Sequence, residues 1–294
     1  MDNITHTLVG AALAEAGLKR RTALGAATLM IGANFPDIDV VAVPLGMGIE
    51  WRRGTTHGFL ALAVLPFVLA GIMLLWDRRV RLRRTPDAVP ADPRQLLLLS
   101  AIAIATHPTL DFMNIYGMRW LMPFRDQWFY ADGLFIVDLW IFVGLVVAVY
   151  LSRRSLRPAR VALVGLAAYV VLMLAVTSAG RARVAAEYPG RRFLVGPNAV
   201  VPWRRDVILE VEDGYRFGNW SLFGPLSVRP DLLPKGDRDP AVHAARQVPR
   251  VAHFLRWARF PTYLVTRDGG QTEVLVGDAR YPGASWASVV VRLP

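Results

Sequence analysis

The chain has 294 residues, a formal net charge of +11 and no cysteine, and 54% of its residues are hydrophobic. The lack of cysteine excludes disulfide bonds and thiolate metal sites within these residues. The hydrophobic residues fall in long blocks before residue 180, so we expect an integral membrane protein whose remaining residues read like a soluble domain.

Six apolar segments precede residue 180, and a helix needs about 20 apolar residues to cross a bilayer. In chain order they are 4–18, 22–35, 57–76, 96–112, 135–151 and 159–179. The third, fifth and sixth are long enough or nearly so, and the fourth becomes so when 96–105 is extended through 106–112. The first two are short, which fits tilted, re-entrant or packed-in helices. We therefore predict a mainly α polytopic membrane bundle of about four to six helices in residues 1–180.

Basic residues gather in alternate loops of this bundle. Loops 19–21, 77–94 and 152–160 hold 13 of the 34 basic residues, whereas loops 36–56 and 113–133 hold four. The positive-inside rule places the three basic loops in the cytoplasm, and six crossings then place both ends of the chain outside it. Topology explains the charge better than phosphate binding does, so we expect the lipid bilayer, and no nucleic acid, as a partner.

From residue 181 onward the pattern changes to short β-prone runs, at 207–211, 262–266, 272–276 and 288–292. Asp268-Gly269-Gly270 between two of these runs predicts a hairpin. The proline-rich stretch 225–249 favours a long loop. Residues 254–260 alternate aromatic residues and arginines, which suggests a segment at the membrane surface or against the bundle. We predict a soluble, β-rich extracytoplasmic domain in residues 181–294.

Eight ionisable residues stand at or near the ends of apolar segments, and the predicted topology places all eight at the non-cytoplasmic face. They are His6, Asp37, Asp39, His57, His107, Asp111, Asp132 and Asp138. Taken singly, each has an ordinary explanation as an interfacial histidine, a turn aspartate or a helix cap. Together they predict a metal site, because histidine and aspartate are ligands of zinc and of harder ions such as manganese and magnesium.

The spacing of His107 and Asp111 supports a shared site, since residues four apart lie on one face of a helix. Pro108 disfavours α geometry at His107, so we expect a helix that restarts at Pro108. His243 and His253 lie in the soluble region without nearby carboxylates, and we expect surface or packing roles for them.

These residues resemble the YdjM-like family, LexA-binding inner-membrane proteins classed as metal-dependent hydrolases. The resemblance covers roughly residues 1–180 and implies a bacterial inner-membrane location. Its features are Asn3-Ile4-Thr5-His6, Asn34-x-Pro36-Asp37-Ile38-Asp39, Arg53-Gly54-Thr55-Thr56-His57, His107-x-x-x-Asp111 and Asp132-Gly133-Leu134-Phe135-Ile136-Val137-Asp138.

The same residues are more distantly similar to zinc-dependent phospholipase C and the S1/P1 nucleases. Those proteins use an N-terminal histidine, an aspartate, a histidine and an H-x-x-x-D pair in this order. The similarity implies that the ligands are His6, Asp37, His57, His107 and Asp111. No second H-x-x-x-E follows in this chain, so we expect one or two ions, with Asp132 or Asp138 as additional ligands.

Our leading hypothesis is a membrane-bound, metal-dependent hydrolase of phosphoester substrates, either a lipid or another envelope amphiphile. His6, His57, His107 and Asp111 are its expected ligands to a divalent ion, zinc before manganese or magnesium, while Asp37 and Asp39 share ligand and general-base roles. One alternative is a non-catalytic membrane protein with a structural metal, a polar cluster or a partner-binding role. Another is a transporter that uses Asp111 and Asp138 as a proton or cation relay.

Overall fold

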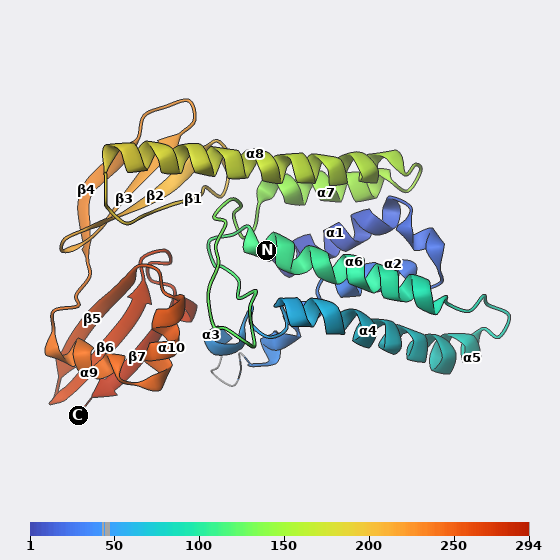
Figure 1. Cartoon of the computed structure of the whole chain (residues 1–294), viewed down its shortest axis with the longest axis horizontal. Helices are drawn as coiled ribbons and strands as arrows, with labels where there is room; N and C mark the ends of the chain where they lie inside the picture. The colour runs from blue at the N-terminus through green and yellow to red at the C-terminus, as the bar shows by residue number, and fades with distance from the viewer. Residues whose placement is uncertain (43, 45–47, 294) are drawn as a thin grey trace. The chain divides into compact units, whose positions relative to one another are not determined.

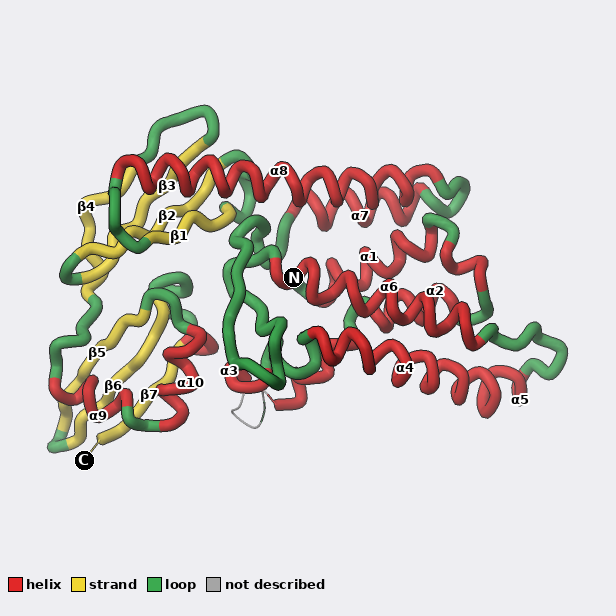
Figure 2. Tube along the Cα trace, viewed as in Figure 1, coloured by secondary structure: helices red, strands yellow, loops and turns green. Residues whose placement is uncertain are grey.

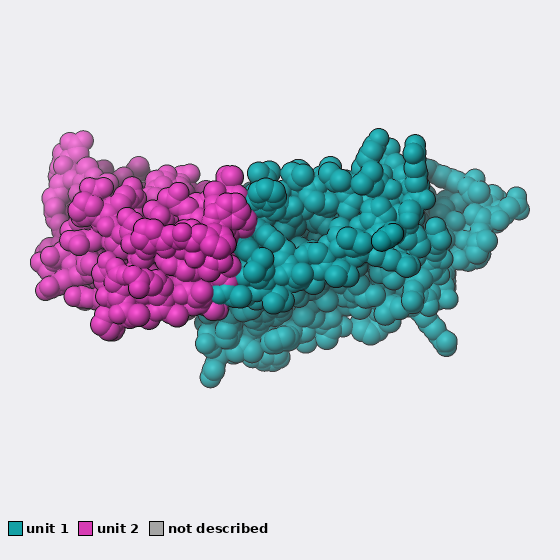
Figure 3. Space-filling view, turned by 90° about the horizontal axis from the view of Figure 1, so that it is seen from above, with its two compact units in different colours: residues 1–175 teal, residues 176–294 magenta. Residues whose placement is uncertain are grey.

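The computed structural model describes residues 1–42, 44 and 48–293. The chain forms two compact units, Met1–Ala175 and Val176–Pro294 (Figure 3). The sequence suggested a division at residue 180, which is close to this boundary. The first unit is helical and the second is β-rich (Figure 2), as predicted.

The first unit contains the helices from α1 to α7 and the beginning of α8 (Figure 1). Its elements are α1 (Asn3–Glu15), η1 (Leu18–Arg21), α2 (Gly25–Gly32), η2 (Phe35–Ala42), α3 (Gly48–Trp51), α4 (Phe59–Trp76), the π-helical turn η3 (Asp77–Arg81), α5 (Leu82–Arg84), α6 (Pro93–Phe112), α7 (Leu139–Leu151) and α8 (Arg157–Glu187).

Within the part of the chain that the structure describes, three continuous helical stretches are long and apolar enough to cross a membrane, namely Phe59–Arg84, Pro93–Phe112 and Arg157–Glu187. Helix α7 is apolar but has only 13 residues. Side chains such as Phe67 and Val164 point outward from these helices, as expected where the surrounding medium is lipid. Helix α2, with 8 residues, rises only about 12 Å and is too short to cross.

Helix α2 is packed closely among its neighbours because glycines let the backbones approach. A Cβ on Gly10 of α1 would lie 2.5 Å from the carbonyl oxygen of Leu29, and a Cβ on Gly32 would lie 2.7 Å from the Cβ of Ala103 on α6. Leu29 and Ala103 are fully buried at this junction. This close packing brings the carboxyl end of α2 beside α6, where the polar residues of the site begin.

Helix α6 runs unbroken through Pro108, so the restart that we expected at this residue does not occur. Proline removes one backbone donor from the helix. The hydroxyls of Thr106 and Thr109 donate to the carbonyls of Ala103 and Ala105, on either side of the Ile104 carbonyl that loses its donor to Pro108. The i, i+4 pairing of His107 with Asp111 on one face is confirmed.

The second unit contains two antiparallel sheets. Strands β1 (Phe193–Pro197), β2 (Arg204–Val211), β3 (Gly214–Ser221) and β4 (Ser227–Pro234) form one sheet in that order. Strands β5 (Pro261–Asp268), β6 (Gln271–Asp278) and β7 (Ser288–Leu293) form the other, accompanied by α9 (Pro240–Arg246), α10 (Pro249–Trp257) and η4 (Ser285–Ala287). The hairpin predicted at Asp268-Gly269-Gly270 is confirmed, since β5 pairs with β6 up to Asp268 and Gln271 and both glycines have positive φ.

Two expectations for this unit were wrong. The stretch 225–249 is not a long loop, because it contains β4 and α9; β4 tolerates its prolines because it lies at the edge of its sheet. The aromatic residues of 254–260 do not face the membrane surface. Phe254 and Trp257 lie on one face of α10 and are buried together with Phe260 inside the second unit.

Candidate metal centre

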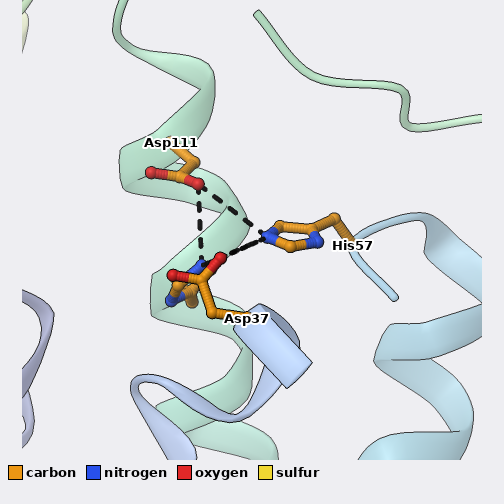
Figure 4. A group of neighbouring side chains, drawn as sticks. Asp37, His57 and Asp111 are labelled. Atoms are coloured by element: carbon orange, nitrogen blue, oxygen red, sulfur yellow. Dashed lines mark hydrogen bonds and ion pairs between the residues drawn. The ribbon is translucent and has the colours of Figure 1, made fainter. Parts of the chain in front are cut away.

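Four of the predicted residues come together at one end of the helical bundle. Asp37, His57, His107 and Asp111 each offer one ligand atom, and these four atoms all lie within 4.8 Å of one another. All four residues are buried. Figure 4 shows the carboxylates of Asp37 and Asp111 facing the same ring nitrogen of His57. They come from η2, from the turn before α4 and from the last two turns of α6, so the site joins three separate parts of the chain.

The distances within this group suit a single small cation. The Nε2 atoms of His57 and His107 are 3.2 Å apart. Oδ1 of Asp37 lies 3.6 Å from each of them, and Oδ2 of Asp111 lies 3.8 and 3.6 Å away. Around a tetrahedral ion with bonds of about 2.0–2.1 Å, neighbouring ligand atoms are roughly 3.3 Å apart. Five of the six distances are within about half an ångström of this spacing, and the ligand atoms of Asp37 and Asp111 lie within 4.8 Å of each other.

Both imidazoles are held by their outer nitrogens. His107 Nδ1 lies 2.6 Å from the carbonyl oxygen of Ala33, which can only accept, so this nitrogen carries the proton. His57 Nδ1 lies 3.3 Å from Oδ2 of Asp39 and 2.9 Å from the hydroxyl of Thr56. The same reasoning gives His57 a proton on Nδ1. With this tautomer on both rings, the two Nε2 lone pairs face each other across 3.2 Å, an arrangement that a cation bound by both nitrogens would satisfy.

Asp39 therefore contacts the outer nitrogen of His57 and is not one of the four residues that offer ligand atoms. Its carboxylate also accepts from the backbone N–H of Arg53 at 2.9 Å. An aspartate in this position fixes the orientation of a metal-binding histidine and makes it a better ligand. Burial raises the pKa of Asp39 above its ordinary value, against the opposing effects of Arg52 and the Arg53 N–H.

Arg52 joins the two aspartates of η2. It contacts Asp37 at 3.1 Å and Asp39 at 2.9 Å, and its side chain is 22% exposed whereas both carboxylates are buried. The oxygen of Asp37 that Arg52 contacts is Oδ1, which also lies 3.6 Å from Nε2 of both histidines. Burial acts to raise the pKa of Asp37, but the imidazoles of His107 and His57 and the charge of Arg52 hold it well below its usual range. Asp37 is thus an anion that pairs with Arg52 and faces both imidazoles.

Arg53 supports the opposite side of the site. Its Nε lies 2.9 Å from Oδ2 of Asp111, and its Nη1 donates to the side chain of Asn114 at 2.8 Å and to the carbonyl of Gly117 at 3.2 Å. Its guanidinium also lies over the ring of Tyr116. Arg53 has a positive φ of 52°, which a non-glycine residue adopts only where its surroundings hold it.

His6 lies beside the group rather than within it. Its ring stacks on that of His107 with centroids 3.9 Å apart, and its Nε2 lies 3.2 Å from Oδ1 of Asp111. The α-amino group of Met1 contacts the same oxygen. His6 Nδ1 has no hydrogen-bond partner among the described atoms.

The structure uses the two predicted additional residues differently. Asp138 caps α7, accepting from the backbone N–H groups of Trp140 and Ile141 at 3.1 Å and from the hydroxyl of Tyr169 at 3.1 Å. Asp132 is buried and has a left-handed φ of 57°. Neither belongs to the four-residue group. In the second unit, His243 is exposed and His253 is half-buried.

Sequence reasoning missed the arginines of this site. Arg52 was counted only as a loop charge, and Arg53 was named in the Arg53-Gly54-Thr55-Thr56-His57 motif without a role. The signal was their position: two arginines in a loop that the predicted topology places outside the cytoplasm, where the positive-inside rule expects few, call for local anionic partners.

Comparison with known proteins identifies the helical part. Residues 1–181 match the model of a family described as YdjM inner membrane protein. The chain is also 25% identical over 159 residues to the uncharacterized protein YfhP of Bacillus subtilis (strain 168). That alignment covers 51% of this chain and 45% of YfhP, so the chain matches about half of that relative's length. No solved structure matches the chain.

The family match covers more than half of the chain, and the protein therefore belongs to the YdjM inner membrane protein family. Family membership and the three apolar helices support an inner-membrane location within a lipid bilayer. The more distant similarity to phospholipase C and the S1/P1 nucleases stays a prediction.

Proposed function

We propose that this member of the YdjM family is a membrane-bound, metal-dependent hydrolase of phosphoester substrates, a lipid or another envelope amphiphile. The observation that carries the proposal is the pair of inward-facing imidazole nitrogens, 3.2 Å apart and flanked by two aspartates. His57, His107, Asp37 and Asp111 would hold the ion, with His6 beside them as a further ligand. Two imidazoles and carboxylates favour zinc, and manganese or magnesium also suit this set.

The chemistry divides between the ion and the chain. A divalent ion at this site supplies a bound water of lowered pKa and polarises a phosphoryl oxygen. Asp39 keeps the His57 ring in its tautomer and orientation. Asp37, an anion paired with Arg52 and 3.6 Å from Nε2 of both histidines, is placed to bind the ion and to accept a proton.

Arg52 is the group best placed to bind the phosphate itself. It is partly exposed, it lies against both aspartates of η2, and its planar guanidinium matches phosphoryl oxygens in two-point contacts. Arg53, which is buried against Asp111, holds the site together instead of reaching a substrate. The partial exposure of Arg52 thus supports a substrate that approaches from the η2 side.

We further propose that the site and residues 181–294 lie on the extracytoplasmic side. In the first unit α1 carries His6 in its first turns and is followed by the basic turn at 19–21, and α4 begins after His57 and is followed by the basic residues of η3 and α5 (Figure 1). Helix α6 runs the other way, from Arg94 to Asp111. The positive-inside rule applied to these basic ends supports a cytoplasmic location for them and an opposite location for the site.

The test begins with metal. Protein purified without chelator and reloaded with zinc, manganese or magnesium should bind one or two ions per chain by elemental analysis. It should hydrolyse members of a panel of soluble and lipid phosphoesters, and a chelator should abolish this hydrolysis. A chain that binds no ion would overturn the proposal.

Burial of all four inner residues favours a second candidate, a non-catalytic protein with a closed structural metal site. The two candidates differ in whether one coordination position is open to water. With cobalt in place of zinc, a four-coordinate closed site would leave the visible spectrum unchanged when phosphate is added. An open site would change it.

A further inference from the structure

A shallow apolar groove of about 460 Å³ lies on the outside of the helical bundle. It is formed by α1, by the end of α2 and by η2, and its lining residues are Thr7, Met30, Ile31, Asn34, Phe35 and Ile38. Its floor is fixed by Asn34, whose amide donates to Thr7 Oγ1 at 2.9 Å and to the carbonyl of Met30 at 3.2 Å. The groove lies within the range of roughly 300–1,000 Å³ typical of small-molecule sites.

The groove and the candidate metal centre share one wall. In η2, Asp37 and Asp39 are buried toward the metal centre while Ile38, between them, is 44% exposed and lines the groove. Thr7 directly follows His6. Asn34 directly follows Ala33, whose carbonyl accepts from His107. Three residues that line the groove are thus direct sequence neighbours of residues at the metal centre, and a molecule in the groove would contact the same segments of the chain.

The surface around the groove is apolar. Val40 and Val41, which follow Asp39 in η2, are 52% and 71% exposed, and Ile31 is 46% exposed. In a protein of the inner membrane such a surface faces lipid chains. Arg52 contacts Asp37 and Asp39 from their polar side and supplies a positive charge at the same wall. The groove is thus apolar on the Ile38 side of η2, and Arg52 binds the two aspartates that flank Ile38 in the sequence.

From this arrangement we propose that the groove holds one acyl chain of a phosphate-bearing membrane lipid, whose phosphate lies at Arg52 and the metal centre. This inference rests on the proposed function and names its substrate class. A bilayer is as apolar as the groove, so the groove adds little binding energy. Its effect is orientation: a chain fixed beside Ile38 sets where the phosphate is held, and such placement strongly affects reaction rates.

Photo-labelling tests the groove without requiring hydrolysis. The full chain is reconstituted in phosphatidylcholine vesicles that contain a phosphatidylglycerol with a diazirine in the middle of one acyl chain. Diacylglycerol and a fatty acid with the same labelled chain report the effects of the chain alone and of negative charge alone. Labelled residues are located by mass spectrometry.

We expect phosphatidylglycerol to label residues 30–38 about tenfold more than either control lipid does, equivalent to about 1.4 kcal/mol. All three probes should label α4 equally. Ile31→Trp, which fills the groove, should reduce the excess labelling to the control level. Ile72→Trp is the matched control, because Ile72 is 50% exposed on α4 and lies away from the groove. His57→Ala should also remove the excess, because it disrupts the site that holds the phosphate.

Equal labelling of 30–38 by all three probes would overturn the inference, as would an excess that survives Ile31→Trp or His57→Ala. Strong labelling by the fatty acid would assign the groove to any anionic amphiphile and would reject phosphate recognition. If phosphatidylglycerol labels the groove as expected but is not hydrolysed by the metal-loaded protein, the groove assignment stands and the hydrolase proposal fails.

Discussion

The two units of the molecule bury charged groups in different ways. In the second unit Asp278 and Arg280 are buried and form a two-point ion pair with both distances at 3.0 Å. Asp278 also accepts from the backbone N–H groups of Arg259 and Arg280, and Arg280 donates to the carbonyl of Trp257. Donors and acceptors match, so this pair is complete without an added ion.

The helical unit buries a larger group that does not match in this way. Arg53 pairs with Asp111 and Arg52 with Asp37, but the two Nε2 atoms of His57 and His107 still face each other. Buried polar groups are costly unless they are satisfied. The difference separates a closed pair that serves the fold from an open group that fits a cation.

The largest effect is expected when a histidine is removed from the buried group of the helical unit. His57→Ala and His107→Ala should each abolish stoichiometric metal binding, measured by elemental analysis, because a tetrahedral site loses one of its two nitrogen ligands. The double variant should be no worse than either single variant, because the site is already empty.

His243→Ala, on an exposed position of α9, is the matched control and should keep full metal content. Unchanged metal content in both His57→Ala and His107→Ala would place any ion elsewhere and would remove the distinction between the two buried groups.

The closed pair should respond in stability rather than in metal content. Asp278→Ala leaves the Arg280 guanidinium buried without its partner, so we expect the second unit to lose about 3–5 kcal/mol of stability. Faster hydrogen exchange at the amides of β5 and β6 in the full chain would report this loss. Glu273→Ala, at an exposed ion pair with Arg292 on the same sheet, should cost about 0–1 kcal/mol. If both variants lost a similar amount of stability, burial of the Asp278–Arg280 pair would not explain its contribution.

The sequence predicted the open group because its residues are conspicuous in apolar surroundings. A histidine or aspartate at the end of a membrane segment needs an explanation, and charge alternation placed these residues at one face. The sequence could not separate Asp37 from Asp39. That separation depends on η2, which turns Asp37 toward the imidazoles and Asp39 toward the outer nitrogen of His57.

The second unit was harder to predict, for a different physical reason. Its hairpin was evident because Gly269 and Gly270 satisfy a turn that requires positive φ. Its core was not, since Phe254 and Trp257 become buried only through contacts with strands distant in the sequence, and an aromatic stretch rich in arginine also suits a membrane surface. Strand β4 was missed because proline argues against a strand except at an edge, and edges are set by the whole sheet.

A smaller effect is expected at Asp39, which is buried but is not one of the four residues that offer ligand atoms. Asp39→Asn preserves shape but weakens the hold on the Nδ1 proton of His57, so metal affinity should fall about 10–100-fold without being lost. Competition with a chromophoric chelator measures this change. Asp231→Asn, at an exposed aspartate of β4, should leave the affinity unaltered. A complete loss of metal would instead make Asp39 a direct ligand.

The smallest effect concerns the hairpin of the second unit. Gly270 has a φ of 82°, and a Cβ added there would meet no atom within 4 Å, so Gly270→Ala should cost only the backbone strain of about 1–2 kcal/mol. Gly224→Ala, at a position without positive φ where the added Cβ makes ordinary contacts, should cost less. Hydrogen exchange at β5 and β6 would measure the first loss, and exchange at β3 and β4 the second. Metal affinity should be unchanged in either variant, because the four inner residues all belong to the helical unit. A loss of metal on weakening this hairpin would mean that the fold of the second unit and the open group are energetically coupled.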